Sequence, residues 1–142
     1  MTGVTVARGR LEQADDLAAL LEAAHEVFVA VLTALRACEN PASVWFGRFV
    51  MAAASAADGR DAVIFAPSMP GHRAHATGHT GEDSSAGTAD TVAGDIASLC
   101  GLAAVRLAQA ASQAADPGDQ AACVRAARCA RGICELLAAG GT

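Results

Sequence analysis

One histidine in this chain has a glutamate on either side of it. Glu22 lies three residues before His25 and Glu26 directly after it, within a segment that reads as helix. A carboxylate beside an imidazole can orient it as a general base. His25, Glu22 and Glu26 are therefore the candidate catalytic residues. The alternative is a histidine at the edge of the core that makes one structural hydrogen bond.

A Glu and a His three residues apart also form the unit from which carboxylate di-iron sites in helical bundles are built. Such a site needs the unit twice, and the sequence holds no second copy. We therefore expect no di-iron centre.

A second group of imidazoles stands in the middle of the chain. His72, His75 and His79 fall within eight residues, followed by two carboxylates, and three imidazoles could supply three zinc ligands. The flanking Gly, Pro and Ser residues indicate a solvated loop instead. No cofactor is predicted, and zinc at these histidines is a minor alternative.

The five cysteines are odd in number and are not arranged in metal-type pairs. They lie within helical patterns, so we expect reduced, buried thiols and a cytoplasmic protein. Cys123 and Cys134 are three helical turns apart and face the same way. With Cys100 opposite, they could form a thiol cluster in the core.

Composition limits the classes of function. About a quarter of the residues are Ala, the strongest helix former, and 53% are hydrophobic. The formal charge is −5 and no basic stripe is present, so nucleic acid is not an expected partner. The N-terminal residues show no apolar segment of signal-peptide length, and no stretch of eighteen or more apolar residues is free of charged residues. We therefore do not expect the protein to associate with a membrane.

The periodicity predicts an all-α fold, a four-helix bundle in one domain over residues 1–142. Asn40-Pro41 and Asp116-Pro117 mark helix starts, and Asp58-Gly59 marks a stop. The run 62–66 is either a strand or a helical turn. The expected helices cover roughly 11–37, 41–58, 89–115 and 117–139, with one long crossover loop, 67–87, between the second and third.

Two expected surfaces lead to two hypotheses of function. Trp45, Phe49 and Phe28 are expected to line a pocket between the helices. The third helix has a face of small residues, bordered by Leu102 and Val105, that resembles a dimer seam. The first hypothesis is a homodimeric accessory module that binds a partner, such as a peptide, or a small apolar ligand. The second is a small tailoring enzyme of bacterial secondary metabolism that uses the His/Glu pair. The small residues are Gly94, Ala97, Gly101, Ala104 and Ala108.

Overall fold

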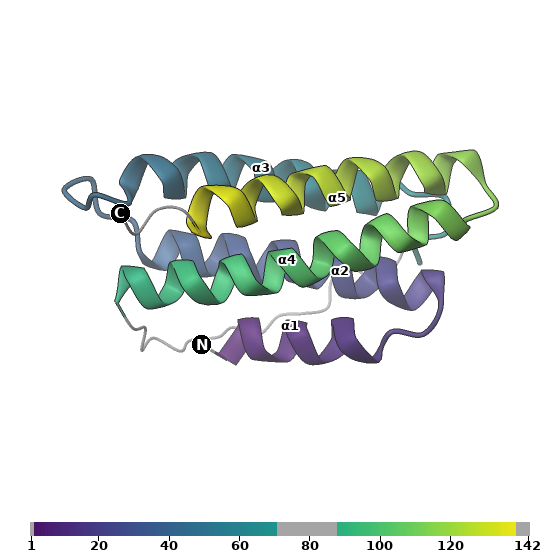
Figure 1. Ribbon diagram of the computed structural model, residues 1–142, viewed down its shortest axis with the longest axis horizontal. Coiled ribbons are helices and arrows are strands. Elements are labelled where there is room, and N and C mark those ends of the chain that lie inside the picture. Colours follow the sequence, from purple (N-terminus) through teal and green to yellow (C-terminus); the bar gives the residue numbers. More distant parts are fainter. Residues whose placement is uncertain (1, 71–87, 139–142) are drawn as a thin grey trace.

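The computed structural model describes residues 2–70 and 88–138, and these residues form five helices and no strand. The all-α prediction is confirmed, but the expected count of four helices is wrong. Helices α2, α3, α5 and α4 pack each against the next, α2 also contacts α4, and α1 lies on α2 and α4 (Figure 1). The elements are α1 (Thr2–Gln13), α2 (Leu17–Ala37), α3 (Phe46–Ile64), α4 (Ala89–Gln113) and α5 (Pro117–Ala138).

The fifth helix is α1, most of which covers residues 2–10, where no helix was expected, and the expected helix over 11–37 is interrupted between Gln13 and Leu17. Asp16 has extended backbone and its carboxylate accepts a hydrogen bond from the amide of Ala19 at 2.8 Å, so it is the N-cap of α2. On the other side of the break, Arg106 of α4 donates to the carbonyls of Leu11 and Ala14 at 2.6 and 2.7 Å. These bonds satisfy acceptors that the end of α1 leaves without helical partners.

The expected limits of the second helix, 41–58, are also wrong. Asn40 accepts a hydrogen bond from the amide of Ala42 and so forms a local turn, while α3 begins at Phe46, five residues after the expected start at Pro41. Gly59 does not stop the helix, which continues to Ile64. The apolar run 62–66 therefore contains the last turn of α3 and is not a strand.

The two C-terminal helices begin at the predicted residues, and a side chain caps each of them. Thr88 accepts from the amide of Thr91, and Asp116 accepts from the amides of Gly118 and Asp119. Helix α4 ends two residues earlier than expected, and α5 is described to Ala138. Of the predicted loop 67–87, residues 71–87 lie outside the described part of the chain.

Most of the small-residue face of α4 is covered within the protomer. Ala97 and Ala104 are buried, and a Cβ on Gly101 would lie 3.5 Å from Sγ of Cys134 on α5. Gly94 and Ala108 are exposed. Close helix packing inside the chain already uses this face, so the small residues of α4 give little support to a dimer seam there.

Helices α2 and α4 are long and apolar enough to cross a membrane, with mean hydropathies of 1.7 and 1.4. Within the bundle, 44% of the most apolar 18-residue stretch of α2 is buried, and 50% of that of α4. Core helices of soluble proteins pass the same test, so the finding assigns no location.

Candidate functional site

His25 lies half-buried on α2, at the edge of the core. Partial burial lowers the pKa of its imidazole below the usual 6.5, and the nearby charge of Arg60 on α3 lowers it further. The side chain is therefore neutral at physiological pH. A neutral imidazole is the form that a general base requires.

The two glutamates near His25, Glu22 and Glu26, have different surroundings. Glu26 forms an ion pair with Arg10 of α1, with 2.6 Å between Oε2 and Nη1. In the described residues no hydrogen bond joins His25 to Glu26. Glu22 lies half-buried one turn earlier on α2. Glu26 thus holds α1 on α2, and the proposed His/Glu catalytic pair stays a prediction.

The expected pocket-wall residues are packed inside the bundle. Trp45 donates from Nε1 to Asp90 of α4 at 2.6 Å, and its ring stacks on Phe49 with 5.5 Å between centroids. Phe28 is fully buried, and its ring lies against the backbone of Gly59. Each of the three aromatic side chains therefore fills space against another group of the core.

His72, His75 and His79, the candidate zinc ligands, lie outside the described residues. Within residues 2–70 and 88–138, no cluster of three or more His, Cys, Asp or Glu side chains is placed to hold a metal ion.

The five cysteines are free thiols, two of them fully buried. Burial raises the pKa of Cys100 to about 12, and the neighbouring Cys134 contributes to the rise. Burial also raises the pKa of Cys123, with a smaller contribution from Asp119 one turn earlier on α5. The thiols of Cys100 on α4 and Cys134 on α5 are therefore neighbours. Cys123, the third residue of the expected cluster, has the carboxylate of Asp119 as its neighbour instead.

Sequence reasoning missed a buried carboxylate on α5. Asp119 is 2% exposed and accepts two hydrogen bonds from Ser68, one from the amide at 2.9 Å and one from the hydroxyl at 2.6 Å. Nearby, Pro67 packs so closely on Gly118 that a Cβ there would lie 2.8 Å from the proline ring. These contacts fix the chain after α3 to the first turn of α5.

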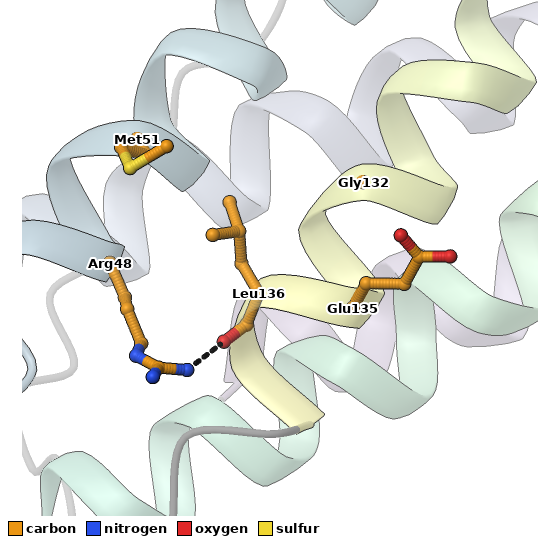
Figure 2. Close-up of a pocket in the computed structure, with 5 residues that line it drawn as sticks. All are labelled: Arg48, Met51, Gly132, Glu135 and Leu136. Carbon is orange, nitrogen blue, oxygen red and sulfur yellow. Dashed lines mark hydrogen bonds between the residues drawn. The ribbon is translucent and has the colours of Figure 1, made fainter.

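A surface hollow of about 480 Å³ lies between α3 and α5 (Figure 2). Arg48 reaches across it and donates to the carbonyl of Leu136 at 3.1 Å. The side chain of Leu136 points toward α3, and Met51 beside it is 59% exposed. The lining residues are Arg48, Met51, Gly132, Glu135 and Leu136.

A second hollow of about 520 Å³ follows the outer side of α5. Both hollows are shallow and open to solvent. Neither is lined by His25, Phe28, Trp45 or Phe49. One signal in the sequence points to the first hollow, because Met51 is a large apolar residue that does not share the buried face of Phe49, Ala52 and Ala56. The lining of the second is Pro117, Gln120, Ala121, Val124, Arg125 and Arg128.

The fold and its surface place the chain in the broad class of all-α helical-bundle proteins. Comparison with protein-family models, with curated proteins and with solved structures found no match.

Proposed function

We propose that this protein is a cytoplasmic accessory module that works as a homodimer and binds a partner through its helical surface. The observation that carries the proposal is the open hollow between α3 and α5, with exposed Met51 on its rim and Leu136 in its floor. When another surface covers apolar side chains that are exposed around a concave surface, water is displaced and the free energy of the system falls.

The state of the core supports a protein partner over a small apolar ligand. Small-ligand sites enclose most of their ligand, usually in a concave pocket lined by apolar side chains. Here the three aromatic residues expected to line such a pocket are packed on Asp90, on each other and on Gly59. The two hollows are open and suit a flat or convex protein surface better.

The enzyme alternative has one supporting observation, the lowered pKa of His25. That shift keeps a base available at neutral pH. The described surroundings of His25 offer the charge of Arg60 and a Glu26 already paired with Arg10. The binding module therefore has the stronger support.

Sedimentation equilibrium of the purified chain tests the proposal. We expect a mass of twice the 14.2 kDa of one chain at micromolar concentrations, falling toward one chain on dilution. A folded protein that stays at the mass of one chain up to about millimolar concentration, where only very weak association would be missed, overturns the proposal.

A further inference from the structure

The hollow between α3 and α5 has an apolar centre. Met51, on α3, lines the hollow and is 59% exposed. Leu136 of α5 is partly buried and points toward Met51 (Figure 2). These side chains form a small apolar surface on the rim and floor of a concave site, where a knob from another molecule displaces water from both partners.

Gly132 is one of the residues that line this hollow. It stands in the interior of α5, where glycine is one of the poorest helix formers. A Cβ at this position would meet no atom within 4 Å, so packing within the chain does not require glycine. The missing side chain leaves room for a side chain of another molecule beside Leu136.

The hollow carries one charge of each sign. Arg48 and Glu135 come from different helices and lie on opposite sides of Leu136 (Figure 2). Arg48 donates to a backbone carbonyl, and neither residue belongs to an ion pair within the described chain. Both side chains are exposed, so both charges are available to a partner.

A surface with this charge arrangement is complementary to itself. In an interface with twofold symmetry, a residue of one protomer contacts a second residue of the other, and the reverse contact also forms. A twofold axis near Leu136 places Arg48 of each protomer over the partner's Glu135. The same operation brings the two apolar centres together.

We propose that the hollow between α3 and α5 is the contact face of the homodimer and that its occupant is a second copy of this chain. The inference rests on the proposed function, which requires a dimer but not this face. It replaces the α4 face expected from the small residues.

Two matched variants separate the two faces. Gly132→Leu fills the hollow, and Gly94→Leu adds the same side chain to the exposed face of α4. A Cβ at Gly94 also meets no atom within 4 Å, so neither variant is expected to disturb the protomer. Thermal melting of each variant first verifies that it folds.

Sedimentation of the wild type and both variants over a concentration series is the test. We expect Gly132→Leu to raise the dissociation constant of the dimer by roughly tenfold or more, as changes at the centre of an interface commonly do. Gly94→Leu is expected to leave the dissociation constant unchanged. A dimer weakened by Gly94→Leu but not by Gly132→Leu overturns this inference and leaves the proposed function standing. A folded wild type that remains monomeric overturns both.

Discussion

The ring of Phe28 lies directly against the backbone of Gly59, so that α2 and α3 meet where one has a large side chain and the other has none. A Cβ at Gly59 would stand 2.4 Å from the end of the ring, which is itself fully buried in the core. We expect Gly59→Ala to destabilise the protein by about 1–3 kcal/mol, although alanine is the better helix former. Urea unfolding measures the effect.

Gly132→Ala is the matched control for that substitution. It makes the same change inside a helix with no atom within 4 Å of the added methyl, so we expect it to stabilise the protomer by up to about 1 kcal/mol. Because the wild type is proposed to dimerise, both are measured at concentrations low enough for the monomer. Equal effects of the two substitutions would show that the ring of Phe28 yields freely.

Removing the buried carboxylate is expected to free the chain that follows α3. Asp119→Ala leaves the amide and hydroxyl of Ser68 without their acceptor, which costs about 1–3 kcal/mol for a partly buried group. Ser68→Ala deletes only the hydroxyl bond and should cost about 1 kcal/mol. Chemical denaturation of both variants is the measurement, and an Asp119→Ala protein as stable as the wild type would contradict this role.

The guanidinium of Arg106 is expected to hold the end of α1 in place. Arg106→Met keeps much of the apolar stem but removes the donors to the carbonyls of Leu11 and Ala14. Bonds from charged donors contribute about 1.5–3 kcal/mol, so the amides of α1 should exchange hydrogen about tenfold faster or more. Arg131→Met, on the exposed side of α5, is the control. Equal protection of α1 in both variants would exclude the clamp.

The stability of the protein should fall in mild acid because of His25. Its folded pKa lies below the unfolded value near 6.5, so the unfolded chain binds more protons between the two values. The stabilisation is therefore complete above about 6.5 and is lost as the pH falls toward the folded pKa. His25→Gln should reduce the difference in unfolding free energy between about pH 7.5 and about pH 5, since the imidazole of His25 titrates in this range and a glutamine side chain does not. An unchanged difference would contradict the shift.

Sequence alone predicted the features that depend on neighbouring residues. Thr88 and Asp116 cap helices through amides two or three residues away, and so α4 and α5 begin where expected. The break between α1 and α2 was missed because the end of α1 is held by hydrogen bonds from Arg106, a residue distant in sequence. The Asn40-Pro41 signal misled because Asn40 closes a turn with Ala42.

The candidate site divides in the same way. The position of His25 at the edge of the core follows from the periodicity of its own helix. Arg60, which acts on its pKa, comes from a different helix, and no local pattern relates the two. The hollow at Gly132 likewise requires α3 and α5 to be placed side by side before Arg48 and Leu136 meet. Tertiary packing decides each of these contacts.

Mixing two charge variants tests most directly the claim that this chain pairs with itself through α3 and α5. Arg48→Glu places two acidic residues opposite each other across the twofold axis, and Glu135→Arg places two basic ones there. Each variant alone should be folded and monomeric, because like charges in contact oppose association.

An equal mixture of the two variants restores opposite charges at both contacts. We expect light scattering of the mixture to show the mass of two chains, at concentrations where each variant alone shows the mass of one. Two results would contradict pairing through α3 and α5: both variants alone dimerise as the wild type does, or both are monomeric alone and the mixture stays monomeric while the wild type dimerises.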